Sequence, residues 1–392
     1  MPEVVIVGGG LEGCAAAWSL ARRGVRDITV IERSTVGSGG TGKSSGVVRC
    51  HYGVSSLAAM ATRSLALFEQ ADEVLGEDVG FHQTGYVVGV GEHNIDALRA
   101  SMSDQRAVGV RTEDIDHAEV ARMWPVADLS PFAAFAWEER GGYGDAYQTA
   151  QAFSAAARRL GVTLRQGTGV TGIVANGARA VGVALADGTT VSADHVVVAA
   201  GPWSVPLVAP FGIHLPITVH REQIVLIDPG RALGPVPVFS DLVSLQYIRP
   251  EGSGQLLFGN SDLADLELAD PDHYSNHATE AFVDIAVEKV GTRLPGLTEA
   301  SIASTYAGCY DVTPDFNPVI SETPLEGLVV AAGFSGHGFK ISPAVGDLIA
   351  DLVLEGTSSV PEIPESDFRW SRFAEGTLLT SPHPYIGAGQ MR

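Results

Sequence analysis

The 392-residue chain is strongly acidic, with 46 acidic against 25 basic residues and a net charge of −21. A surface of this charge repels nucleic acid and anionic membranes, so we expect neither as a partner. With 45% apolar residues, the chain is long enough to bury a large core in one or two domains. The three cysteines, Cys14, Cys50 and Cys309, are widely spaced and odd in number, which indicates reduced thiols in a cytoplasmic setting.

Two stretches bear on targeting and membranes. Residues 1–3 lack the basic region of a secretory signal. The uncharged stretch 196–213 has nearly the length of a membrane span, but it contains Pro202, Pro206 and Pro210. Because prolines remove hydrogen bonds that a helix in lipid needs, the stretch predicts a buried strand followed by a loop.

The N-terminus has the pattern of a βαβ unit. Residues 4–7 form an apolar run that ends in three glycines, as central parallel strands do. The alanine- and leucine-rich stretch 11–23 predicts a helix that Gly24 ends. A second apolar strand, 28–31, ends at Glu32, which completes the unit of a dinucleotide fold.

The turn between this strand and this helix carries G-x-G-x-x-G at Gly8, Gly10 and Gly13. These glycines allow a tight turn, a close approach to a pyrophosphate and close packing of helix on strand, while Glu32 can accept ribose hydroxyls. A structural turn beside a surface glutamate is the alternative. The predicted dinucleotide contacts here are Gly8, Gly10, Leu11, Glu12, Gly13, Glu32 and Arg33.

Residues 37–44 (GSGGTGKS) also satisfy the P-loop pattern of nucleotide triphosphatases. A P-loop opens a long helix, whereas the residues that follow Lys43 are poor helix formers. We therefore interpret the stretch as a loop along the same dinucleotide, with Thr41, Ser44 and Ser45 as donors to its phosphates. A P-loop NTPase remains the remote alternative.

Further strands come from distant parts of the chain. Residues 195–201 and 327–333 are valine-rich and both end in Ala-Ala-Gly, at Gly201 and Gly333. Together with Gly8, three glycine-ended strands predict one parallel sheet and a ligand longer than NAD, held along its length. Residues 161–194 predict an antiparallel meander with a hairpin turn at 187–188. Strands of a second sheet are expected at 84–90, 220–227, 242–249, 255–259 and 304–312.

A C-terminal helix follows Gly333. We expect Ser342 to cap it and Pro343 to occupy its first turn, with Gly356 at its end. Its buried stripe is predicted to be Val345, Leu348, Ile349, Leu352 and Val353.

Five segments resemble the FAD-dependent amino acid oxidases of the D-amino-acid oxidase and sarcosine oxidase group, in particular members that oxidise sarcosine and dimethylglycine. They are the G-x-G-x-x-G with Glu32, TGKSSGVVR (41–49), AAGPW (199–203), YDVTPD (310–315) and GFSGHGFK (333–340). The resemblance implies an FAD enzyme that oxidises the C–N bond of a secondary or tertiary amino acid. It also implies a Rossmann-like FAD-binding domain, α/β, interleaved with a substrate domain, α+β, on a mostly antiparallel sheet. The expected boundaries are 1–82, 148–215 and 325–392 for the first domain and 83–147 and 216–324 for the second.

The resemblance also assigns roles in the substrate site. Arg49 and Lys340 match the arginine and lysine that bind the substrate carboxylate, and Tyr310 and Tyr247 match tyrosines of the pocket. Surface charges and ordinary packing are the alternatives. The remaining predicted cofactor contacts, of which Trp203 also fits simple packing, are Val170, Ala200, Gly201, Trp203, Gly333, Gly336, His337, Gly338, Phe339 and Lys340. We expect His337 to contribute through its backbone and do not expect its imidazole to act as a general base.

Two departures from the family pattern concern chemistry. The cysteine that tethers FAD in some members falls at Gly308, and the neighbouring Cys309 should point to the opposite face of its strand, so we expect a packed thiol and non-covalent FAD. The lysine that activates oxygen in some members is replaced by Leu257. The electron acceptor is therefore oxygen or another molecule. No metal is expected, since His273 and His277 have no companion ligands.

Two related functions stay open beside amine oxidation by a single chain. The chain could be the flavin subunit of a heteromeric sarcosine-type enzyme, with partner subunits. The same scaffold could also oxidise a 2-hydroxy acid.

Overall fold

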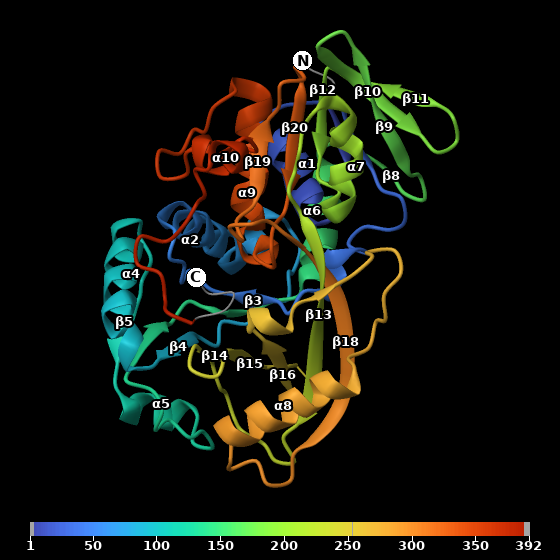
Figure 1. The fold of residues 1–392 in the computed structure, drawn as a ribbon. Helices are drawn as coiled ribbons and strands as arrows, with labels where there is room; N and C mark the ends of the chain where they lie inside the picture. Colours follow the sequence, from blue (N-terminus) through green and yellow to red (C-terminus); the bar gives the residue numbers. More distant parts are fainter. Residues whose placement is uncertain (1–3, 253, 388–392) are drawn as a thin grey trace.

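The computed structural model describes residues 4–252 and 254–387. Within these residues the strands form four sheets, of six, three, nine and two strands. The six-stranded sheet occupies the upper half of Figure 1 and the nine-stranded sheet the lower half, and the chain passes between them several times. No helix of this described part has the length and apolar character that crossing a bilayer requires.

The six-stranded sheet contains the expected βαβ unit, with α1 (Leu11–Arg22) as its helix. β1 lies between β2 and β12 and runs parallel to both, and β12 is parallel to β20. The order of the strands confirms that one sheet is assembled from distant parts of the chain. It is β19 (Val319–Glu322), β20 (Leu328–Ala332), β12 (His195–Val198), β1 (Val4–Val7), β2 (Ile28–Ile31) and β8 (Thr163–Arg165).

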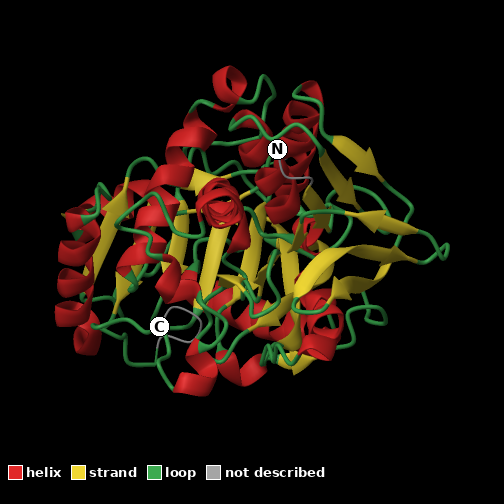
Figure 2. Cartoon of the chain, turned by 90° about the horizontal axis from the view of Figure 1, so that it is seen from above, coloured by secondary structure: helices red, strands yellow, loops and turns green. Residues whose placement is uncertain are grey.

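The meander expected at 161–194 is correct only in its later part. β9 (Val170–Asn176), β10 (Arg179–Leu185) and β11 (Thr190–Ser192) form an antiparallel sheet, which projects at the right edge of Figures 1 and 2. The first segment, β8, instead pairs in parallel with β2 at the edge of the larger sheet. A strand of three residues is too short for its hydrophobic pattern to show whether it belongs to the parallel sheet or to the antiparallel meander.

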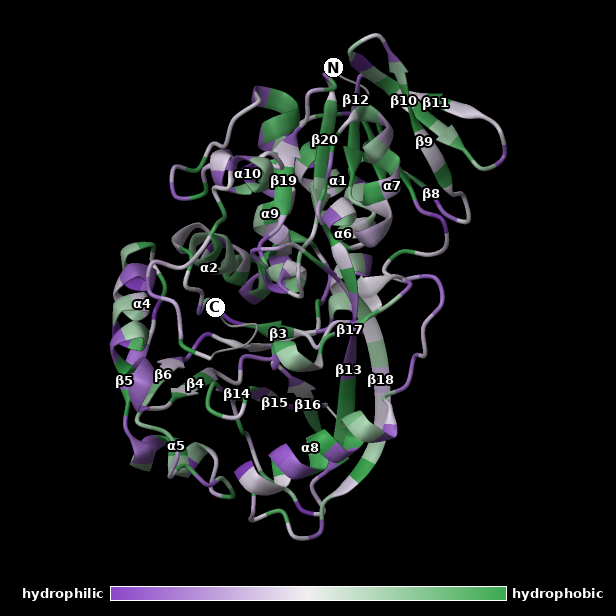
Figure 3. Ribbon diagram, viewed as in Figure 1, coloured by the Kyte–Doolittle hydropathy of each residue, from purple (hydrophilic) through white to green (hydrophobic). Residues whose placement is uncertain are grey.

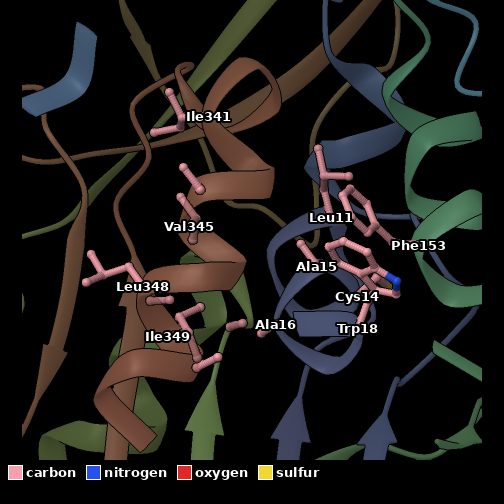
Figure 4. Close-up of a cluster of buried hydrophobic side chains, with 14 of the residues drawn as sticks. Leu11, Cys14, Ala15, Ala16, Trp18, Phe153, Ile341, Val345, Leu348 and Ile349 are labelled. Carbon is pink, nitrogen blue, oxygen red and sulfur yellow. The ribbon is translucent and has the colours of Figure 1, made fainter. Parts of the chain in front are cut away.

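Helices cover the six-stranded sheet, and α1 and α9 (Gly338–Glu355) pack closely against each other (Figure 4). A Cβ atom on Gly346 of α9 would lie 2.6 Å from the carbonyl carbon of Ala15, so only glycine permits this approach. The predicted stripe of α9 is buried, and Gly356 ends the helix with a φ of +71°. The helices on the same cluster are α2 (Ser55–Glu69), α3 (Ala71–Val74) and α6 (Ala146–Arg159).

The predicted start of α9 is wrong. The helix begins at Gly338, so Ser342 is not its cap and Pro343 lies inside it. Proline leaves a carbonyl without its helical donor, here that of Phe339. The hydroxyl of Ser342 donates to this carbonyl at 2.9 Å, which compensates the loss.

The second sheet is mostly antiparallel, with one parallel pair between β4 and β14. Residues 242–245 form a turn, so the strand expected at 242–249 begins only at Gln246. The nine strands of the described part are β17 (Glu267–Leu268), β13 (Thr218–Asp228), β16 (Leu256–Asn260), β15 (Gln246–Pro250), β14 (Val238–Asp241), β4 (Tyr86–Val90), β6 (Ala134–Glu138) and β5 (Glu113–Ile115), with β18 (Ser301–Val312) paired to β13.

Short elements complete the fold. β3 (Val47–Val48) pairs with β7 (Gly142–Tyr143) between the two large sheets. The stretch 196–213 contains β12 and, where only a loop was expected, the short helix α7. The helix α8 (Glu280–Arg293) carries both hydrophilic residues, purple in Figure 3, and hydrophobic residues, green in Figure 3. This is expected for a helix that packs one of its sides against a sheet. The remaining helices are α4 (Ile95–Ala107), α5 (His117–Met123), α7 (Ser204–Val208), α8 (Glu280–Arg293) and α10 (Arg372–Glu375).

A buried ion pair holds α10 against the loop after β18. Arg372 and Asp315 are both fully buried, and two guanidinium nitrogens donate to the carboxylate at 2.8 and 2.9 Å. Arg372 also donates to the carbonyl of Asn317 at 2.7 Å. Removal of one partner leaves the other charge buried without compensation.

We expect Asp315→Ala to lower the free energy of unfolding by roughly 3–5 kcal/mol, because Arg372 is then buried unpaired. Urea denaturation measures this change. Glu375→Ala is the matched control. Glu375 lies on the same helix as Arg372 but forms a surface ion pair with Arg369, so its loss should change stability little. Equal losses in both variants would contradict the role of the buried pair.

Candidate active site

A cavity of about 560 Å³ lies where the carboxyl ends of β1, β12 and β20 meet. This is the position at which open parallel sheets bind ligands. The predicted residues that line it are Gly8, Gly10, Leu11, Glu12, Glu32, Arg33, Thr41, Ser44, Val170, Ala200, Gly201, Trp203, Tyr310, Gly336, Gly338 and Phe339. The predicted residues outside its lining are Gly13, Ser45, Arg49, Tyr247, Gly333, His337 and Lys340.

The glycines of the first turn are needed for close packing. A Cβ atom on Gly8, whose φ is +109°, would lie 2.3 Å from the carbonyl oxygen of Ala199. One on Gly13 would lie 2.1 Å from the carbonyl oxygen of Gly8. Gly13 therefore serves the contact between helix and strand behind the cavity, while Gly10 exposes backbone to it.

Glu32 is fixed in place at the end of β2. Its two carboxylate oxygens accept hydrogen bonds from the backbone N–H groups of Gly9 at 2.8 Å and Ser34 at 2.7 Å. Each oxygen keeps a further lone pair, so the side chain can still accept hydroxyl donors from a ligand in the cavity.

The stretch 37–44 folds back onto the start of α1. Residues 40–43 form one 3-10 turn, and the short strand β3 follows where a P-loop would open a long helix. The hydroxyl oxygen of Thr41 accepts from the N–H of Leu11 at 3.1 Å, which leaves its O–H free to donate. The loop thus lines the same cavity as the first turn, and nothing here supports a triphosphatase.

Two carboxyl groups stand at the cavity wall, of which Asp311 is buried and Glu12 partly exposed. Burial raises the pKa of Glu12 to about 7, and the nearby Asp311 adds to this effect. Burial raises the pKa of Asp311 to about 6, although the N–H of Gly333 donates to it at 2.7 Å. Asp311 was quoted within YDVTPD but not predicted as a site residue. Sequence alone gives no sign of its burial.

Two cations, Arg49 and Lys340, are buried near one another, with 6% and 7% of their surfaces exposed. Arg49 follows β3 and Lys340 lies in the first turn of α9. Burial and the charge of Arg49 hold the pKa of Lys340 well below its usual value. Within residues 4–252 and 254–387, neither side chain forms an ion pair.

The surroundings of the two cations are aromatic and carbonyl groups. The guanidinium carbon of Arg49 lies 4.4 Å from the ring centroid of Tyr52, a cation–π contact, and its Nη1 donates to the carbonyl of His51. The ammonium of Lys340 donates to the carbonyl of Gly336 at 3.3 Å. Buried cations without carboxylate partners suit an anionic ligand.

Tyr310 and Tyr247 are neighbours on the second sheet. Burial raises the pKa of Tyr310 well above its usual value and that of Tyr247 to about 12, so both stay protonated. A Cβ atom on Gly336 would lie 2.4 Å from the Tyr310 ring, and one on Gly259 2.1 Å from the Tyr247 ring. Tyr310 lines the cavity, whereas Tyr247 packs at the edge of a core cluster.

His337 immediately precedes α9. Its Nδ1 lies 3.4 Å from the hydroxyl of Tyr52, and burial with the charge of Lys340 holds its pKa well below the usual value. The imidazole is therefore neutral. A neutral ring of such low basicity is poorly suited to accept a proton.

The expectation that Cys309 is a packed thiol is wrong. Cys309 is only half-buried and lines the cavity, and burial raises the pKa of its thiol to about 11. The expected assignment of the two faces of β18 is reversed: Cys309 lines the cavity, and Gly308 takes the packed face, because a Cβ atom there would lie 2.5 Å from Cβ of Lys43. One face of a strand can be crowded while the opposite face meets a cavity.

At the other edge of the cavity, Arg33 stacks on Trp203, with its guanidinium carbon 3.8 Å from the ring centroid. Asp272 accepts from Arg33 at 2.9 Å and from the indole N–H of Trp203 at 3.0 Å. Asp272 escaped prediction because it lies in an irregular loop with no motif. The three side chains tie the loop 270–274 to the first sheet.

Residues 3–352 match the model of the FAD dependent oxidoreductase family, DAO. The chain belongs to this family. It is an FAD-dependent oxidoreductase that acts on amino acids, and its Rossmann-like domain is interleaved with a substrate domain. The oxidoreductase shares 27% identity with the sarcosine oxidase subunit beta of Rhodobacter capsulatus, over 96% of this chain and 90% of that one.

Two further comparisons place the oxidoreductase among solved and studied relatives. It superimposes on the crystal structure of L-proline dehydrogenase from P. horikoshii with a TM-score of 0.87 and 29% identity, over 96% of this chain and 98% of that chain. It is 27% identical to human mitochondrial dimethylglycine dehydrogenase, over 90% of this chain but 42% of that protein.

The protonation of Glu12 should make FAD affinity depend on pH. Above about pH 7 the carboxylate of Glu12, which lines the cavity near Gly338 and Asp311, is ionised. A further negative charge in the cavity opposes the binding of the anionic FAD, so the FAD dissociation constant should rise several-fold from about pH 6 to about pH 8. The dissociation constant at each pH can be measured by the quenching of free FAD fluorescence during titration with the apoprotein.

In Glu12→Gln most of this pH dependence should disappear. Glu113→Gln, an exposed carboxylate on β5, is the control that should retain it. An unchanged pH profile in Glu12→Gln would contradict the assignment.

Proposed function

We propose that this oxidoreductase oxidises the C–N bond of a secondary or tertiary amino acid, N-methylated or cyclic. The observation that carries this proposal is the pair of buried basic side chains, Arg49 and Lys340, neither of which forms an ion pair within the described residues. The buried carboxyl of Glu138 interacts electrostatically with Arg49, but burial raises its pKa to about 7. An amino acid substrate brings the missing carboxylate. Its amine does not require a charged partner if it binds in the neutral form.

The cavity fits FAD by the chemistry of its walls. The backbone at Gly8 and Gly10 and the start of α1 present N–H groups and the positive end of a helix to a diphosphate. Glu32 would accept the ribose hydroxyls, and Thr41 and Ser44 would donate to phosphate oxygens. At the opposite end, Gly338 and Phe339 begin α9, whose N-terminus would face the flavin ring. No residue is required as a covalent tether.

Bound FAD would supply a hydride acceptor for the carbon next to the amine nitrogen, and water would hydrolyse the resulting imine. The residues of the chain would bind the substrate and orient it. The Arg49 fork and the Lys340 ammonium would hold the carboxylate, which fixes the distance from the reacting carbon to the flavin. The carboxylate would also restore the usual protonation of Lys340. Tyr310 lines the cavity.

We expect Arg49→Ala to raise KM for a carboxylated amine by roughly 10- to 100-fold and to leave its decarboxylated analogue nearly unchanged, since a hydrogen bond to a charged group is lost. Anaerobic bleaching of the flavin by N-methyl, cyclic and primary amino acids and by 2-hydroxy acids identifies the substrate first. Arg111→Ala is the control: it removes an exposed arginine and should not change KM for either substrate. Equal effects on both substrates would refute the role of Arg49.

The electron acceptor is proposed to be a molecule other than oxygen. Leu257, fully buried, stands where the resemblance places the lysine that activates oxygen. We expect the reduced enzyme to be reoxidised more slowly by oxygen than by an artificial acceptor such as ferricenium, as stopped-flow absorbance would show. Rapid reoxidation by oxygen would contradict this.

A second candidate function is that of the flavin subunit of a heteromeric enzyme, favoured by the likeness to a protein named sarcosine oxidase subunit beta over 90% of that protein. Size exclusion of the natively purified protein would then give a mass above that of the recombinant chain.

A further inference from the structure

The segment that follows α10 connects the two large sheets. Figure 1 shows it as the red trace that descends past α2 toward α4. At its upper end, the N–H of Leu379 donates to Asp315 at 3.0 Å and its carbonyl accepts from Asn317 at 2.7 Å. At its lower end, the N–H and carbonyl of Ile386 bond to the side chain of Asn94 at 2.8 and 3.0 Å. The segment is thus anchored at both ends.

Tyr385 is the side chain that this segment buries. Its exposed fraction is 6%, and it packs in the cluster that contains Tyr86, Leu98 and Met102. Its hydroxyl lies 2.7 Å from Nε2 of His51, and the two rings stack with centroids 6.0 Å apart and an interplanar angle of 15°. The contact is therefore specific in both its polar and its apolar part.

His51 in turn supports Arg49. Its backbone carbonyl accepts a hydrogen bond from the Arg49 guanidinium. Its Nδ1 is buried and has no partner in the part of the chain that the structure describes, so the Tyr385 hydroxyl is the polar anchor of the ring there. Burial and the charge of Arg49 lower the pKa of His51 to about 3, so the ring is neutral and gains no charge of its own.

We propose that Tyr385 is a positioning residue for the substrate carboxylate: it fixes the His51 ring, and through the His51 backbone it fixes the Arg49 fork. This inference rests on the proposed role of Arg49. Tyr385, His51 and Arg49 all lie outside the lining of the FAD cavity. Of the three, Arg49 is the residue that the proposed function assigns to the substrate carboxylate, so the effect of Tyr385 and His51 would reach the substrate through Arg49. Without the Tyr385 hydroxyl, both ring nitrogens of His51 are buried without partners, and the segment 49–51 is free to shift.

The test measures binding of acetate, a carboxylate probe, and of acetamide, its neutral isostere, to the oxidised FAD-bound protein. Perturbation of the flavin absorbance gives both dissociation constants. In Tyr385→Phe we expect the acetate constant to rise about three- to tenfold, the size of one lost hydrogen bond, and the acetamide constant to stay unchanged. Ile386→Ala, whose side chain is 73% exposed beside Tyr385, is the control and should change neither.

A second pair of variants separates positioning from packing. In His51→Gln the amide reaches the place of Nε2 and can keep the bond to Tyr385, whereas in His51→Asn it ends near the place of Nδ1 and cannot. Acetate affinity should stay near that of the parent in His51→Gln and fall in His51→Asn as in Tyr385→Phe.

Unchanged acetate affinity in both Tyr385→Phe and His51→Asn would overturn the inference, as would equal losses for acetate and acetamide. Arg49→Ala distinguishes this failure from that of the proposed function. If Arg49→Ala leaves acetate binding intact, the proposed role of Arg49 fails. If it abolishes acetate binding while the other variants bind normally, only the inference fails.

Discussion

The burial of two basic side chains, Arg49 and Lys340, without ion-pair partners among the described residues is the constraint on which the rest of the site depends. A buried cation loses its hydration, and the interior must replace this with dipoles, aromatic faces or an opposite charge. Arg49 finds the carbonyl of His51 and the face of Tyr52, and Lys340 finds the carbonyl of Gly336. These partners are neutral groups, so their compensation of charge is incomplete, and in the proposed function an anionic ligand would complete it. Substrate affinity and the cost of folding this pocket are therefore linked.

The architecture brings these charges to a cofactor cavity by close backbone packing. Arg49 follows β3, between the sheets, whereas Lys340 belongs to α9, which packs on α1 through Gly346. Because α1 and α9 approach so closely, the N-termini of both helices lie along one cavity. In the proposed function the two helix ends would face one long molecule, the first toward its diphosphate and the second toward its ring. A bulkier residue at Gly346 would separate the two ends.

Local patterns account for what the sequence could predict. The βαβ unit, the glycine-ended strands and the buried stripe of α9 all depend on residues within one or two turns of each other, so periodicity reveals them. Arg49 and Lys340 came from resemblance, since no spacing relates them. The predictions for the start of α9 and for Cys309 were wrong because a neighbouring residue makes an otherwise unfavourable arrangement possible. Pro343 is tolerated inside α9 because Ser342 satisfies the carbonyl that proline leaves free. Cys309 meets a cavity because its neighbour Gly308 takes the crowded face.

The C-terminal segment shows most clearly what local sequence patterns cannot predict. Tyr385 and His51 are 334 positions apart, and the residues around Tyr385 have no periodicity that would predict burial. Only the folded chain reveals that an irregular segment fills the space behind Arg49. Because this segment lies outside the flavin cavity, its residues can change without disturbing the cofactor. A change there would alter how the carboxylate is held and leave the oxidation chemistry intact, so substrate preference on this scaffold can vary independently of flavin binding.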